Sequence, residues 1–210
     1  MANYTGLAQN VIDGAITQVQ GQVESLIAQG EDPLGIINQG LIAGMVVVGA
    51  RFKAGEMYVP EVLMSARAMS AGVEIVRPLI ADTDMPSFGK VVIGTVKGDL
   101  HDIGKNLVGM LLQSSGFTVI NLGVDISPEQ FVIAVKDHNP DIVALSALLT
   151  TTMTAMKDTI DCLEEEGLRG KVKIIVGGAP VSQEFADEIG ADGFAPDAGS
   201  AADLCKKLLV

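Results

Sequence analysis

The chain has 210 residues, of which 48% are hydrophobic and 4% aromatic with no tryptophan, so we expect one large or two small domains with an aliphatic core. A formal net charge of −12 at pH 7 makes nucleic acid and anionic membrane surfaces unfavourable partners. The first residues lack a basic region followed by an apolar one, and no apolar run reaches membrane-spanning length. We therefore expect a cytoplasmic protein with no signal peptide.

Residues 1–81 carry apolar positions at intervals of three and four, the pattern of helices that bury one face. The pattern predicts one helix over 5–28, a second over 33–52 with Gly44 as a point where it can divide, and another over 60–76. Three or four such helices predict a bundle. The two cysteines, Cys162 and Cys205, lie in expected helices without CxxC spacing, which indicates reduced thiols.

A polar stretch at 82–89 separates this helical pattern from the rest of the chain, and we expect a linker there. Residues 90–210 alternate strand-like and helical patterns, which predicts a parallel sheet with helices on both faces. Five strands favour the flavodoxin-like order 2-1-3-4-5, whose ligand crevice lies between strands 1 and 3. The expected strands are 90–96, 117–121, 141–146, 172–176 and 192–195, and the expected helices are 103–115, 128–138, 152–166, 182–189 and 199–209.

The loop after the first expected strand holds one of only two histidines in the chain, His101, with carboxylates at Asp99 and Asp102. Ser146 ends the third expected strand, so the order 2-1-3-4-5 brings both positions to the ligand crevice. The other histidine, His138, falls in a polar turn and is expected to be solvated.

Three ligand classes fit this loop poorly. A nucleotide site would show GxGxxG or a Walker A sequence after the first strand, and neither is present. A phosphorylated receiver domain would place a lone aspartate at the end of strand 3, where Ser146 stands. A single histidine with acidic neighbours cannot complete a zinc shell. One imidazole does suit a metal whose other ligands come from a macrocycle, and Asp99 could then accept the second ring N–H.

Three short elements at the ends of expected strands occur in order, Asp99-x-His101-x-x-Gly104, Ser146-Ala-Leu148 and Gly177-Gly178. This combination resembles the cobalamin-binding motif of the methionine synthase and methylmalonyl-CoA mutase class. The resemblance implies a base-off cobalamin whose tail enters a slot beside the sheet. It implies that His101 is the axial cobalt ligand, that Asp99 orients it and that Ser146 extends the hydrogen-bond chain. The glycines would leave room for the tail, and the remaining implied contacts are Asp102, Ile103, Leu148 and Thr150, with the stretch 150–152 offering polar groups.

The helical region adds a second resemblance. The stretch from Gly49 to Val62 is similar to the helical cap of methionine synthase and of corrinoid methyltransferase proteins, although Tyr58 and Val59 stand where the family often has Phe and Leu. This resemblance implies that residues 1–81 form a cap over the upper cobalt face and that 90–210 form the cobalamin-binding domain. Phe52 and Val59 match the positions that shield the methyl group in that cap, and Met57 is their neighbour in the same turn.

Together these elements resemble the free-standing corrinoid protein of a three-component methyltransferase system. That resemblance implies a cofactor that cycles between Co(I) and methyl-Co(III), with the methyl group coming from methanol, a methylamine, a betaine or a methoxyarene. It implies as partners a substrate-specific barrel methyltransferase, a second methyltransferase to tetrahydrofolate or coenzyme M, and a reductive activator. The alternative is a cobalamin-binding sensor or regulatory module that transfers no methyl group.

Overall fold

The computed structural model describes residues 3–80 and 87–209. The chain divides into two compact units, Met1–Ser87 with Ser114–Gly116, and Phe88–Gln113 with Phe117–Val210. We call them the helical unit and the α/β unit. Most of the linker expected at 82–89 lies outside the described residues.

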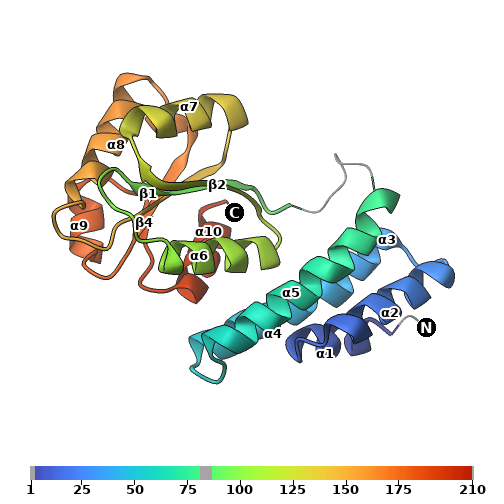
Figure 1. The fold of residues 1–210 in the computed structure, drawn as a ribbon. Helices are drawn as coiled ribbons and strands as arrows, with labels where there is room; N and C mark the ends of the chain where they lie inside the picture. Colours follow the sequence, from blue (N-terminus) through green and yellow to red (C-terminus); the bar gives the residue numbers. More distant parts are fainter. Residues whose placement is uncertain (1–2, 81–86, 210) are drawn as a thin grey trace. The chain divides into compact units, whose positions relative to one another are not determined.

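The helical unit is all-helical in its described part, as the sequence predicts (Figure 1). Asp32 caps the second helical region through its side chain, which accepts a hydrogen bond from the Gly35 N–H at 2.9 Å, and Pro33 follows at the first helical position. The segments are α1 (Tyr4–Ile12), α2 (Ile16–Ala28), α3 (Pro33–Gly35), the π-helical segment η1 (Ile36–Ile42), α4 (Ala43–Lys53), α5 (Val59–Val76) and the 3₁₀ turn η2 (Arg77–Leu79).

Two details of the helical prediction are wrong. The single helix expected over 5–28 is broken into α1 and α2, because Gly14 adopts a left-handed backbone at φ 65° that the apolar spacing does not reveal. Gly44 does not divide the next region, which stays helical from Pro33 to Lys53. A Cβ at Gly44 would lie 2.7 Å from the carbonyl oxygen of Ala8, so this glycine permits close packing of α4 on α1.

The continuous helical region Pro33–Lys53 is long and apolar enough to cross a membrane by length and composition alone, which we did not expect. Half of its most apolar window is buried within the structure, where it packs against α1 and α5. The buried core helix of a soluble protein passes the same test.

The α/β unit contains a five-stranded parallel sheet in the order β2-β1-β3-β4-β5, which confirms the predicted topology. One apolar core packs α7, α8 and α9 on one face of the sheet, and a second packs α6 and α10 on the other (Figure 1). The strands are β1 (Lys90–Val96), β2 (Thr118–Ile126), β3 (Ile142–Ser146), β4 (Lys173–Gly177) and β5 (Gly193–Phe194). The helices are α6 (Ile103–Ser114), α7 (Pro128–His138), α8 (Thr154–Glu165), the 3₁₀ turn η3 (Arg169–Lys171), α9 (Gln183–Glu188) and α10 (Ala198–Leu208).

Both cysteines are free thiols in helices, as predicted. Cys205 in α10 is fully buried in the core between this helix and the sheet, and this burial raises the pKa of its thiol to about 12. Cys162 in α8 is only partly buried, and its thiol pKa is raised by burial and by neighbouring glutamates. Neither thiol is activated as a nucleophile.

Candidate functional site

The candidate site is built on the loop between β1 and α6, at the carboxyl ends of the strands. In the sheet register Thr95 in β1 lies opposite Ser146 in β3, and Ser146 lies opposite Gly177 in β4. The structure therefore brings the three motif elements to neighbouring strand ends. This edge is where ligands bind in open α/β sheets.

Asp99 is fully buried and its carboxylate accepts five hydrogen bonds. Oδ1 accepts from the His101 ring Nδ1 at 2.7 Å and from the His101 backbone N–H at 3.1 Å. Oδ2 accepts from the backbone N–H groups of Leu148 at 2.7 Å and Leu149 at 3.3 Å, and from the Thr152 hydroxyl at 2.7 Å. Burial opposes ionisation, but these donors outweigh it and hold the pKa of the Asp99 carboxyl well below its usual range.

The ionised Asp99 carboxylate fixes the tautomer of His101. Such a carboxylate can only accept hydrogen bonds, so the imidazole proton lies on Nδ1 and the Nε2 lone pair is free to bind a metal. The His101 side chain is 51% exposed, so a ligand from outside can reach it. A histidine held in this way by a carboxylate is the usual arrangement of a metal-binding imidazole.

Thr95 in β1 holds the backbone of His101 through a hydrogen bond. The Thr95 side chain is fully buried in β1, and its hydroxyl donates to the His101 carbonyl oxygen at 2.8 Å. The ring and the main chain of His101 are thus held by separate groups. Thr95 was not predicted as part of the site, because a threonine inside an apolar strand gives no signal of its own.

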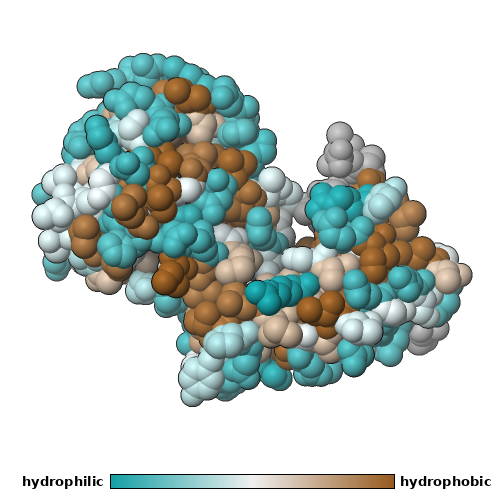
Figure 2. All heavy atoms as spheres, in the orientation of Figure 1, coloured by the Kyte–Doolittle hydropathy of each residue, from teal (hydrophilic) through white to brown (hydrophobic). Residues whose placement is uncertain are grey.

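Exposed apolar side chains lie along the same loops. Leu100 is 70% exposed and Ile103 is 86% exposed, and Leu148 and Leu149 beyond β3 are each more than two-fifths exposed. Apolar patches of this kind stand among polar groups on the visible surface of the molecule (Figure 2). Large apolar side chains left in water beside a potential metal ligand suit the apolar faces of a macrocycle.

The three motif glycines leave space or close contacts that larger residues would remove. A Cβ at Gly104 would meet nothing within 4 Å, whereas one at Gly177 would lie 3.0 Å from the Ala195 carbonyl oxygen. Gly178 has φ 130°, and a Cβ there would come within 1.8 Å of the Ala147 carbonyl oxygen. The free Nε2, the apolar rim and the open space at Gly104 fit a cobalamin held through His101, whereas Gly177 and Gly178 permit close backbone packing at the strand ends.

Two further predicted residues of this unit lie on its surface. Asp102 is exposed and accepts a hydrogen bond from the Asn106 amide at 2.9 Å, and Thr150 is exposed. The hydroxyl that donates to Asp99 is that of Thr152, which lies in the polar stretch 150–152 expected from the sequence. The role of Ser146 in extending the hydrogen-bond chain stays a prediction. Lys105, which we did not predict, is almost fully buried and donates to two asparagine side chains.

Phe52, Met57 and Val59 lie around the turn between α4 and α5 of the helical unit. Phe52 is in the last turn of α4 and is partly buried, Met57 is buried, and Val59 at the start of α5 is 39% exposed. Gly55, at φ 73°, allows the chain to reverse between the two helices. The three side chains thus belong to one end of this helix pair.

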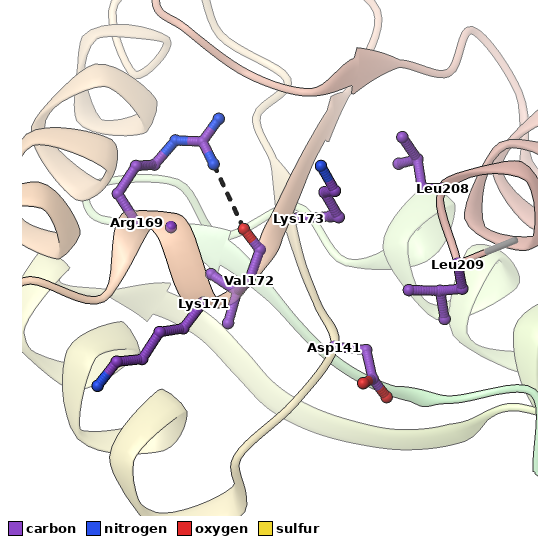
Figure 3. A pocket seen from close by; sticks show the side chains of 8 residues that line it. Asp141, Arg169, Lys171, Val172, Lys173, Leu208 and Leu209 are labelled. Atoms are coloured by element: carbon purple, nitrogen blue, oxygen red, sulfur yellow. Dashed lines mark hydrogen bonds between the residues drawn. The ribbon is translucent and has the colours of Figure 1, made fainter.

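A cleft of about 260 Å³ lies at the amino ends of the strands, the edge of the sheet opposite the His101 loop. Arg169 beside it is already committed, because its guanidinium donates to the Val172 and Gly190 carbonyls and pairs with Asp192 at 2.9 Å. We assign no function to it. It is lined by Asp141, Arg169, Gly170, Lys171, Val172, Lys173, Leu208 and Leu209 (Figure 3).

Two family models, each described as a B12 binding domain, match residues 4–77 and 89–204. Over these ranges they cover both units of the chain. The chain belongs to the B12-binding corrinoid proteins. Its cofactor is therefore cobalamin, as the motif spacing predicted.

Relatives of this corrinoid protein extend over nearly its whole length. It is 45% identical to a corrinoid protein of Desulfitobacterium hafniense (strain Y51), over 97% of this chain and 95% of that one. It is 42% identical to dimethylamine corrinoid protein 2 of Methanosarcina acetivorans, over 100% and 99% of the two chains. Among solved structures, the methanol:cobalamin methyltransferase complex of Methanosarcina barkeri matches with 33% identity and a TM-score of 0.88, over 97% of this chain and 78% of that one.

Proposed function

We propose that this corrinoid protein carries a methyl group between two methyltransferases on a base-off cobalamin whose lower axial ligand is His101. Corrinoid proteins of methylamine and methanol methyltransferase systems are its relatives, which supports the carrier role and methyltransferases as partners. The observation that carries the ligand assignment is the buried Asp99 carboxylate at 2.7 Å from His101 Nδ1, which leaves Nε2 available. When bound, cobalt supplies the nucleophile that takes the methyl group and the leaving group that releases it.

Within this proposal, Asp99 keeps the proton on Nδ1 and holds the ring direction. Gly104 leaves space for the cofactor tail, and Gly177 and Gly178 allow the chain segments at the strand ends to pack closely. Leu100, Leu148 and Leu149, with Ile103, would cover the bound cofactor beside His101 and exclude water from it.

The helical unit is proposed to shield the opposite side of the cofactor. We place the cap at residues 1–81, the linker at 82–89 and the cobalamin-binding domain at 90–210. Phe52 and Val59 supply the apolar surface that protects the transferred group from water and oxygen, and the buried Met57 lies in the same turn. This role needs apolar volume at the turn between α4 and α5, which the structure provides.

The donor and acceptor complete the proposal. Relatives named for dimethylamine are 42–45% identical over nearly the full chain, so a methylated amine is the first donor to test, ahead of methanol, a betaine or a methoxyarene. Tetrahydrofolate and coenzyme M are the acceptors to test. We place the protein in the cytoplasm, with a reductive activator as a further partner.

Electron paramagnetic resonance of the Co(II) form tests the ligand assignment. The wild-type protein is expected to show superhyperfine coupling to one nitrogen. In protein that carries [ε-¹⁵N]histidine, the three-line ¹⁴N splitting should be replaced by the two-line splitting of ¹⁵N. Methyl transfer is tested by mixing the loaded protein with each donor and its barrel methyltransferase. A protein that shows the coupling yet exchanges methyl groups with no donor would be a sensor and would contradict the carrier role.

A further inference from the structure

Asp125 has a backbone conformation that most residues avoid. Among the described residues, the non-glycine positions with positive φ are Asp125 at 56° and Asn139 at 45°. Asn139 is explained by its place at the C-cap of α7, where left-handed residues are common. Asp125 lies inside β2 and caps no helix, so its conformation requires another cause.

Irregularities in β2 place Asp125 next to the His101 loop. Between Ile93 and Gly94 of β1 the partner residue in β2 advances from Asn121 to Gly123, and between Gly94 and Val96 it advances from Gly123 to Ile126. Each shift inserts one extra residue into β2, as a β-bulge does. Because one inserted residue reverses the face to which later side chains point, the bulges determine where the side chain of Asp125 is directed.

Asp125 makes two hydrogen bonds to the segment that carries Asp99. Its carboxylate Oδ1 accepts from the Gly98 N–H at 2.7 Å, and its own backbone N–H donates to the Asp99 carbonyl oxygen at 3.0 Å. These bonds hold the main chain at both ends of the Gly98–Asp99 pair. The turn is closed by a hydrogen bond of its own, from the Asp99 N–H to the Val96 carbonyl oxygen at 3.1 Å with Gly98 at φ 81°, and Asp125 adds two contacts to it from the neighbouring strand.

We propose that Asp125 is a positioning residue for the cobalt ligand, a proposal that rests on the proposed role of His101. The Asp99 carboxylate can meet its donors from the loop after β3 and the His101 ring only if the Gly98–Asp99 main chain keeps its place. Asp125 keeps it there. The left-handed backbone of Asp125 is maintained because it allows both the carboxylate and the N–H of one residue to reach this segment.

Two substitutions separate the hydrogen bond from the backbone strain. Asp125→Asn retains an acceptor oxygen for the Gly98 N–H and tolerates positive φ, whereas Asp125→Gly removes the acceptor and relieves the strain. The matched control is Asn139→Gly, which makes the same kind of change at the other left-handed residue. Three quantities are measured for each: amide hydrogen exchange at residues 98–101 of the cobalamin-free protein, the dissociation constant for cobalamin, and the Co(II) resonance spectrum.

For Asp125→Gly we expect faster exchange of the Gly98 amide, a dissociation constant raised about tenfold, and a reduced fraction of Co(II) with axial nitrogen coupling, because changes around metal ligands typically cost about 10–100-fold. Asp125→Asn and Asn139→Gly should match the wild type in all three. If Asp125→Gly does not fold, Asp125→Glu, which moves the acceptor, replaces it with the same expectations. Wild-type affinity and spectrum in the acceptor-deficient variant would overturn the proposal.

The measurements also separate this proposal from the proposed function. If His101→Ala leaves the wild-type Co(II) coupling unchanged, the ligand assignment fails and with it the effect of Asp125 on the ligand. If His101→Ala removes the coupling while Asp125→Gly changes neither exchange nor spectrum, the ligand assignment stands and only the role of Asp125 fails.

Discussion

The two units hold their candidate cofactor residues in different ways. In the α/β unit, the fully buried Asp99 carboxylate accepts five hydrogen bonds and fixes the His101 ring, and Thr95 fixes the main chain. In the helical unit, Phe52 and Val59 are partly exposed apolar side chains at the ends of two helices. One unit uses directed polar contacts, and the other uses apolar volume.

The difference follows from what each site has to do. A metal ligand must present one lone pair in one direction, and hydrogen bonds set direction because their energy falls steeply with angle. A shield has only to exclude water, and non-directional apolar packing is sufficient for that. Substitutions in the two units should therefore affect different measured quantities.

His101→Ala should have the largest effect on cofactor coordination. Removal of the imidazole leaves cobalt without its axial nitrogen, so the nitrogen coupling in the Co(II) spectrum should vanish entirely. The side chain is 51% exposed, and the fold should therefore retain its thermal unfolding midpoint. Cobalamin should still bind weakly through its tail. Unchanged coupling in this variant would show that the ligand is another group.

Asp99→Asn should rank next. All five groups that contact the Asp99 carboxylate are donors, so the NH₂ of an asparagine would face donors and lose a hydrogen bond in a buried site. We expect cobalamin affinity to fall about 10–100-fold and the free energy of unfolding of the cobalamin-free protein to fall by about 1–3 kcal/mol.

Asp102→Asn is the matched control for that variant. Asp102 also neighbours His101, but it is exposed and accepts a hydrogen bond from the Asn106 amide. Denaturant unfolding of the cobalamin-free protein should give a nearly wild-type free energy for it, because the exposed Asp102 carboxylate leaves no buried donor unpaired. Equal losses in both variants would indicate a general effect of negative charge near the loop and would contradict the specific role of Asp99.

The parts predicted correctly from the sequence are those with strong local signals. Strand β1 has the predicted bounds 90–96 because its apolar, β-branched run has no competing pattern. Strand β2 was expected to end at 121 but continues to Ile126, because its bulged end contains Asn121, Gly123 and Asp125, residues typical of loops.

The candidate site shows the same limit. The motif spacing pointed to Asp99, His101 and the glycines, and the structure places these motif elements at neighbouring strand ends. The support from Thr95, Thr152 and Asp125 depends on which hydroxyl or carboxylate reaches a given atom across the sheet, and spacing along the chain does not encode that distance. Such contacts can be identified only from the folded structure.

Thr95→Val should have a smaller effect than Asp99→Asn. Valine keeps the shape of threonine in β1 but removes the hydroxyl that donates to the His101 carbonyl at 2.8 Å. One lost hydrogen bond of about 0.5–1.5 kcal/mol corresponds to at most roughly a two- to thirteenfold loss of cobalamin affinity. Thr95→Ser retains the hydroxyl and should restore the affinity. A serine variant as weak as the valine variant would assign the effect to packing within the strand.

Phe52→Ala should have the smallest effect on cobalamin binding and a distinct effect on protection. Because Phe52 belongs to the helical unit and makes no contribution to the His101 network, the dissociation constant and the Co(II) spectrum should match the wild type. The loss of its ring should admit oxygen, so the methylated protein should decay faster under illumination in air, which absorbance spectroscopy follows directly. Tyr58→Ala, at a side chain that is 73% exposed in the same turn, is the control and should decay at the wild-type rate. A Phe52→Ala protein that is as durable as the wild type would show that this side chain only packs the helical bundle, and the contrast between a polar ligand network and an apolar shield would then rest on Met57 and Val59.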